Sequence, residues 1–195
     1  MPVTPATLVP NILANMSAVN LVGISDLQFA NALAISFVQF LKTIPVTTVH
    51  TGVLGSGVGT GRVSIEPSSG ISILSSQFQV NAINGPNSVQ LATAIINALT
   101  SELNANASVQ VAIVGTSNGT GIGNLSAASG SSFIPILTTQ LSANQINGPI
   151  QPKLSQAIGI GVSTWLKSGV INTIDTGAPV FPYGVSGGAG QGIVF

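Results

Sequence analysis

The chain has 195 residues with four basic side chains, four acidic side chains, one histidine and no cysteine, so 4% of its residues are charged, against roughly 25% in an ordinary soluble domain. Nucleic-acid binding requires a basic stripe that displaces counterions, and four scattered cations cannot form one. The sequence has no run of about 20 apolar residues that could span a membrane, and without cysteine it has no disulfides, thiol nucleophiles or thiolate metal sites.

One segment of the sequence recurs. Residues 73–86, ILSSQFQVNAINGP, return as residues 136–149, ILTTQLSANQINGP, and a fainter copy begins at residue 8. Repetition at a held offset indicates repeated structural units, which we place at 1–66, 67–129 and 130–195, the third with an apolar C-terminal tail. A unit of about 62 residues is only marginally stable alone, so we expect the three to fold together.

The first part of each unit predicts a helix that stops at a glycine. In the second unit, apolar residues recur at helical spacing. They are Ile73, Leu74, Phe78 and Ile83. The Asn-Gly-Pro that follows predicts a helix stop, with Gly85 in the left-handed position and a proline that cannot continue the helix. The same prediction applies to Gly148 in the third unit.

A second helix is predicted to follow. Ser25 with Gln28, and Asn87 with Gln90, have the spacing of a capping box. Small residues along this helix predict close approach to neighbouring helices, and one face, apolar every four residues, should be buried. That face comprises Phe29, Leu33, Phe37 and Leu41 in the first unit, Leu91, Ile95, Leu99 and Leu103 in the second, and Leu154, Ile158, Val162 and Leu166 in the third.

β-branched runs at 46–51, 109–114 and 170–174 predict a strand after each second helix, and glycine-rich segments follow at 52–61, 115–123 and 186–192. Because glycine loses much conformational freedom on ordering, we predict mobile arms, and we expect a chain without residues 53–61 to fold but to assemble poorly. The predicted fold class is α+β: three tandem repeats of about 62 residues, each helix–turn–helix–strand followed by a Gly-rich arm.

We predict no catalytic, cofactor-binding or metal site, and no enzyme activity. The arms lack the Gly-x-Gly-x-x-Gly spacing that dinucleotide binding requires. His50 and Asp175 occupy the same place in two units, which is one pattern for an acid–base pair, but the second unit has neither. The preferred interpretation is a polar residue at a strand end. One histidine and four carboxylates are a poor source of the three or four converging ligands that a metal ion needs.

Phe40, Glu102 and Trp165 share one position of the second helix. The aromatic side chains there predict packing at a helix end or at a subunit contact, with a carbohydrate-binding platform as the alternative. The C-terminal tail contains Tyr183 and ends on apolar residues 193–195. We expect this end to dock on its own chain or on a partner, because a free apolar terminus is unfavourable in water.

The near-absence of charge also has consequences for association. Few ions must be desolvated when such a surface is buried, and little repulsion keeps copies apart. Three similar units give the chain three similar surfaces, which suits a three- or six-fold position in a symmetric particle. We therefore predict a component of a large assembly, whose partners are other proteins and copies of itself, with no nucleic acid or membrane as partner.

The stretch LSQAIGIG at 154–161, the Thr-x-His/Asp-Thr-Gly strand ends and the GVGTG arm at 57–61 carry a family resemblance. The chain resembles low-charge Gly/Ser/Thr/Ala-rich repeat proteins among the virion structural proteins of tailed bacteriophages. The resemblance implies a capsid-associated, neck, tail or baseplate subunit of the virion. The alternative is an extracellular surface or adhesion protein that binds carbohydrate or ice through Thr/Ser/Asn-rich strands, although the N-terminal residues show no signal-peptide pattern.

Overall fold

The computed structural model describes residues 4–21, 23, 25–44, 46–53, 56–63, 65–106, 108–114, 118–126, 130–166, 170–177 and 186–194, with the strands described by their backbone. Two helices are followed by two strands, and this order occurs three times along the chain. The helices are α1 (Pro5–Ala18), α2 (Asp26–Leu41), α3 (Pro67–Val80), α4 (Ser88–Asn106), α5 (Gly130–Ala143) and α6 (Gln151–Leu166).

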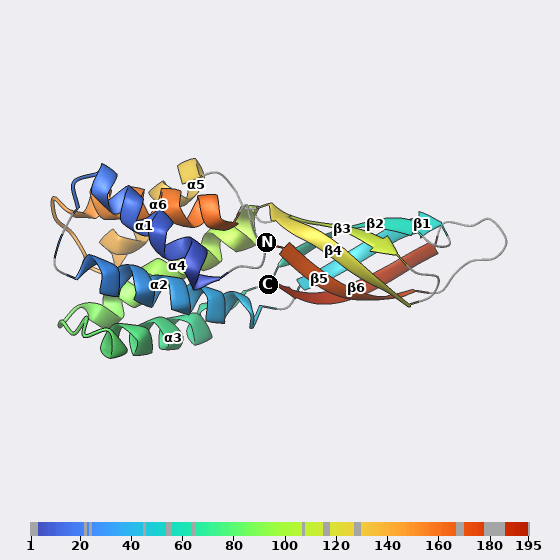
Figure 1. The fold of residues 1–195 in the computed structure, drawn as a ribbon, viewed down its shortest axis with the longest axis horizontal. Coiled ribbons are helices and arrows are strands. Elements are labelled where there is room, and N and C mark those ends of the chain that lie inside the picture. Colours follow the sequence, from blue (N-terminus) through green and yellow to red (C-terminus); the bar gives the residue numbers. More distant parts are fainter. Residues whose placement is uncertain are drawn as a thin grey trace.

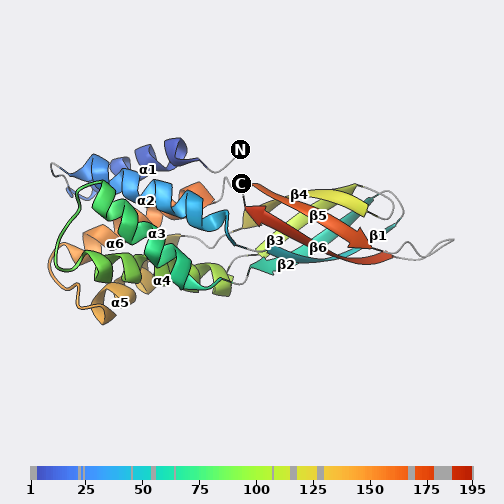
Figure 2. The same ribbon diagram turned by 90° about the horizontal axis from the view of Figure 1, so that it is seen from below.

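The six helices lie side by side in chain order, and α6 packs against α1, so they form a closed ring. Figures 1 and 2 show this ring at one end of an elongated molecule, with the strands extending from its other end. The connections within the helix pairs, α1–α2, α3–α4 and α5–α6, all lie at the end of the ring away from the strands. We call this the distal end; it comprises residues 19–21, 23, 25–29, 80–91 and 144–154.

The strands close on themselves as well. They are β1 (Val46–Val53), β2 (Ser56–Val63), β3 (Ser108–Val114), β4 (Asn118–Ser126), β5 (Val170–Gly177) and β6 (Ser186–Val194). They form a closed barrel in chain order, each antiparallel to its neighbours, with β6 pairing β1. Closure leaves none of the six strands with an unpaired edge. One link to the helix ring is made by Asn104, whose side chain hydrogen-bonds both the N–H (3.0 Å) and the carbonyl (3.1 Å) of Ile65, just after β2.

The predicted α+β fold class is wrong. Among the residues whose side chains are described, the secondary structure is six helices with no strand, and the hydrophobic core belongs to the helix ring. The predicted unit, with one strand per helix pair and a free glycine-rich arm, is wrong as well, because two strands follow each helix pair. By their backbone, the segments predicted as arms lie largely in β2, β4 and β6, hydrogen-bonded on both sides within the barrel. Deleting residues 53–61 would therefore remove most of a paired strand.

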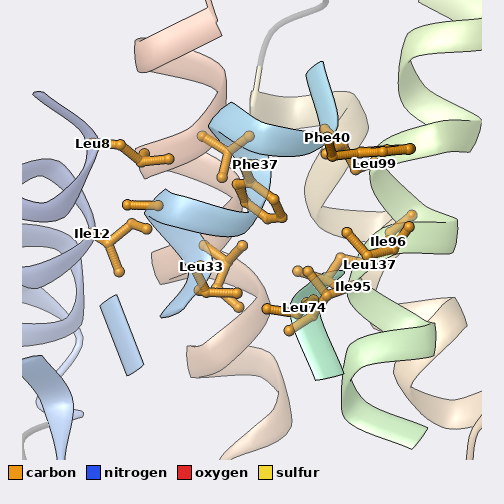
Figure 3. Close-up of a cluster of buried hydrophobic side chains, with 14 of the residues drawn as sticks. Leu8, Ile12, Leu33, Phe37, Phe40, Leu74, Ile95, Ile96, Leu99 and Leu137 are labelled. Carbon is orange, nitrogen blue, oxygen red and sulfur yellow. The ribbon is translucent and has the colours of Figure 1, made fainter. Parts of the chain in front are cut away.

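The predicted apolar face of the second helices is confirmed. Phe37 of α2 and Ile95 of α4 are fully buried, and Figure 3 shows them in one cluster with Leu8 and Ile12 of α1 and Leu74 of α3. Burying each such side chain contributes roughly 1.5–3 kcal/mol. The nine residues of the predicted face with 2% exposure or less are Leu33, Phe37, Leu41, Ile95, Leu99, Leu103, Ile158, Val162 and Leu166. Phe29, Leu91 and Leu154 are partly buried against the same core.

The first helices end differently from the prediction. Helix α3 ends at Val80, and the left-handed residue is Ala82 (φ 57°), three positions before Gly85. The N–H of Ala82 donates to the Gln79 carbonyl (3.1 Å), and that of Ile83 donates to the Phe78 carbonyl (2.8 Å). This is a Schellman motif, in which the following apolar residue packs back on the helix.

The same motif closes α1 and α5, with Asn20 (φ 54°) and Gln145 (φ 62°) in the left-handed position. Gly85 is therefore not a helix cap, and the space around its Cα is open. Gly148 has φ +155°, a value that L residues rarely adopt, but it lies in the connection after the α5 cap. The predicted capping box at Ser25 is also wrong: its side chain makes no capping bond, and the carboxylate of Asp26 accepts from the Gly23 N–H (2.6 Å).

Candidate functional site

The backbone of β1 contains His50, and that of β5 contains Asp175; the side chains of both lie outside the described residues. In the barrel His50 pairs with Gly188 and Asp175 pairs with Gly190, both in β6. Strand β6 therefore lies between His50 and Asp175. Their partners in β6 are two positions apart, so the two residues are not cross-strand neighbours.

Glycine occupies alternate positions along each returning strand: 57, 59 and 61 in β2, 119, 121 and 123 in β4, and 188, 190 and 192 in β6. Successive residues of a strand lie on opposite faces, so these glycines share one face of the barrel. In register they pair with residues of the neighbouring strands β1, β3 and β5. The alternation builds a sheet surface, and these glycines lie within paired strands, whereas a phosphate-binding loop has its glycines between a strand and a helix.

By its backbone, the described end of the C-terminal tail pairs with its own chain. Within β6, Ile193 pairs with Asn172 and Val194 pairs with Ile171, both in β5. This confirms one of the two docking partners that the sequence left open. Tyr183 lies outside the described residues.

The shared position of Phe40, Glu102 and Trp165 lies at the joints between repeats, where the second helix of one repeat packs on the first helix of the next. The three joints are α2–α3, α4–α5 and α6–α1, and all three residues are buried to 2% exposure or less. The predicted packing at a helix end is confirmed. Burial contradicts the carbohydrate-platform alternative for Trp165, because a sugar cannot stack on an indole that is 1% exposed.

A different pair of residues makes the contact at each joint. The ring of Phe40 lies over Gly70 in α3, where an added Cβ would come within 3.0 Å of the ring. The carboxylate of Glu102 accepts a hydrogen bond from the Ser132 hydroxyl of α5 (2.9 Å). The indole N–H of Trp165 donates to the Thr7 hydroxyl of α1 (3.1 Å). These pairs are not interchangeable, so they specify which helix packs on which.

Small residues permit further close approaches, as the sequence predicted. An added Cβ on Gly159 of α6 would lie 2.5 Å from a side-chain carbon of Ile134 in α5, and one on Gly161 would lie 3.4 Å from the backbone of Ile12 in α1. At the α2–α3 joint, Phe29 stacks on Phe78 with ring centroids 5.9 Å apart. Helices are therefore in close contact both at the joints and within the α5–α6 pair, as in the close-packed interior of a protein.

One buried hydroxyl departs from the repeat pattern. Ser155 of α6 is fully buried and its Oγ has no hydrogen-bond partner, whereas the equivalent positions are Ala30 and Ala92, both fully buried. An unpaired buried hydroxyl costs stability without an offsetting bond. Nothing in the described structure gives Ser155 a ligand to bind.

Among the described side chains, the large apolar ones that are exposed lie at the distal end. Leu27, Val80, Val89 and Ile150 are 54%, 78%, 55% and 58% exposed. They come from all three repeats, at or beside the helix–helix connections. The sequence does not single them out, because each adjoins a turn between two helices, where capping signals dominate the local pattern. This end, which has few charged residues, is the candidate interaction surface of the helix ring.

Within the described part of the chain, no three His, Cys, Asp or Glu side chains come together as a metal site would require. None of the described helices is long and apolar enough to cross a membrane. Comparison with protein-family models, curated proteins and solved structures finds no match to this chain.

Proposed function

We propose that this protein is a non-enzymatic structural subunit of a bacteriophage virion that works through protein–protein assembly. The observation that carries the proposal is that three repeats close into one body: their six helices form one ring and their six strands form one barrel. A single chain thereby acquires the architecture of a trimer. Such a chain makes three comparable contacts with a partner of three- or six-fold symmetry, as occurs along the axes of symmetric particles.

The charge distribution also supports assembly. Of the charged side chains that the structure describes, Lys42, Glu66 and Lys153 are exposed, Asp26 is half-buried and Glu102 is buried. The rest of the exposed helix surface is mostly Ser, Thr, Asn, Gln, Gly, Ala and Pro. Burying such a surface requires little ion desolvation, and the resulting contact should depend weakly on salt.

Quantitative mass spectrometry of density-purified phage particles tests the proposal. We expect the protein at a fixed copy number relative to the other particle proteins, retained after washing at high salt. Its absence from particles would refute the proposal. Recovery from washed cells that produce no particles would instead favour the surface-protein alternative.

A control separates incorporation from adsorption. Protein added to finished particles should not be retained, whereas protein produced during assembly should. Equal retention of both would mean that the protein merely adheres, and would count against a structural role.

A further inference from the structure

The distal end presents an apolar surface that comes from every repeat. Leu27 lies in the first turn of α2 and Val89 in the first turn of α4, while Ile150 directly precedes α6. Val80 adds an exposed side chain at the end of α3. Each of the four exposes more than half of its surface, which is unfavourable in water, so this end gains from being covered.

The same end carries two charges, on different repeats. Asp26 begins α2 in the first repeat, and Lys153 lies in the first turn of α6 in the third. The α3–α4 connection, residues 81–87, contains no charged residue. Neither Asp26 nor Lys153 forms an ion pair with any other residue that the structure describes. The distal end is thus a nearly neutral surface with one anion and one cation at separate repeats.

We propose that two copies of this chain associate head to head through their distal ends. A two-fold axis between stacked three-repeat rings allows three arrangements, in which the first, second or third repeat faces its own copy. Facing first repeats bring Asp26 against Asp26, and facing third repeats bring Lys153 against Lys153. When the second repeats face each other, Asp26 of each copy meets Lys153 of the other.

Charge complementarity therefore selects a second copy as the occupant and selects one arrangement of three. In that arrangement Val89 of each copy lies at the uncharged second repeat, on the two-fold axis. The two ion pairs sit on opposite sides of the apolar contact. An end-on contact between two rings is small compared with obligate dimers, so we expect a dissociation constant of roughly 10 µM to 1 mM. The proposal does not depend on the virion assignment.

Sedimentation equilibrium on the purified full chain, from micromolar to about millimolar concentration, tests the association. We expect a monomer–dimer equilibrium that Val89→Asp abolishes. A wild-type chain that remains monomeric over this range would overturn the proposal. So would a Val89→Asp variant that dimerises as well as the wild type.

Charge reversal tests the arrangement. Lys153→Glu should weaken self-association roughly tenfold, because each dimer loses two attractive contacts and gains two repulsive ones. The fold should tolerate it, because an acidic residue suits the first turn of a helix. Glu66→Lys, at an exposed site at the start of α3 and away from the distal end, is the matched control and should leave the dissociation constant unchanged.

Mixing two variants gives the sharpest outcome. Asp26→Lys and Lys153→Glu should each self-associate poorly, yet dimerise with each other at least as tightly as the wild type, because both pairs are then attractive. Melting curves check that Asp26→Lys folds despite losing its bond from Gly23. If folded variants show no preference for the mixed dimer, or if Lys153→Glu alone dimerises as well as the wild type, the proposed arrangement is wrong.

Discussion

Gly70→Ala should destabilise the protein although alanine favours a helix. The new Cβ would lie 2.8 Å from Cγ2 of Ile96 and 3.0 Å from two ring carbons of Phe40, well inside the 3.5–4.0 Å of a favourable carbon contact. Both neighbours are buried to 1% exposure or less, so neither can swing into solvent. Overpacking of this kind costs about 1–3 kcal/mol, while the gain in helix propensity is about 1 kcal/mol. We expect a net loss of about 1 kcal/mol.

Urea unfolding, followed by circular dichroism at 222 nm, measures this loss. Phe40→Leu removes the ring edge that the new methyl group meets, at a cost of roughly 1–2 kcal/mol for the space left behind. The double variant should therefore be more stable than the sum of the two single effects predicts. Gly85→Ala, where the structure leaves the added Cβ open space, is the control and should change little. A Gly70→Ala protein as stable as the wild type would refute the close packing of this joint.

Three further changes test other features of the structure. Ser155→Ala should raise the free energy of unfolding by about 1 kcal/mol, because it removes an unpaired buried hydroxyl; Ser163→Ala, whose hydroxyl has a backbone acceptor, should not, and equal gains would contradict this explanation. Ala82→Gly should raise the melting temperature, since glycine adopts the left-handed conformation without the strain of about 1 kcal/mol that alanine bears there; an unchanged value would argue against the Schellman cap. We expect the shared glycine face to be the inner one, because a narrow six-stranded barrel leaves little room there, so Gly121→Val should disrupt the barrel more than Thr120→Val; the reverse order, measured by thermal unfolding, would place the glycines outside.

The helical part of the fold was largely predictable from the sequence. Apolar residues at a period near 3.6 mark a buried helix face wherever that face lies, and so Phe37, Ile95 and Val162 are buried as expected. The helix ends were less predictable. Glycine is the usual left-handed cap, yet Ala82 adopts that conformation here, and Ile83, which follows it, packs against the hydrophobic core as the apolar residue of a Schellman motif does.

The barrel could not be predicted from composition. The glycine content of segments such as 57–61 favours a mobile arm, because glycine is costly to order. Their Gly-x-Gly-x-Gly pattern has a period of two, which is the period of a strand. In a closed barrel each of these strands is hydrogen-bonded on both sides, and that bonding offsets the entropy lost. No local signal predicts closure, because it depends on β6 reaching β1 across most of the chain.

The joints were unpredictable for a related reason. Sequence comparison within the chain places Phe40, Glu102 and Trp165 at one position, but it cannot say what each faces until the order of helices around the ring is known. The bond from Trp165 to Thr7 joins residues 158 apart in the sequence, and it exists because the last repeat packs on the first. The third joint is therefore a consequence of ring closure, whereas the first two connect consecutive repeats.

Closure also limits how this protein can associate. An open repeat array can grow by adding units to its terminal repeats, and it needs capping repeats to stop this growth. Here each helix face that meets another repeat is already occupied within the chain, and each of the six strands already has two neighbours. Lateral growth by repeat or strand addition would require opening the ring or the barrel. Association that leaves the fold intact must therefore use its outer sides or its ends, and among the described side chains the large exposed apolar ones gather at the distal end.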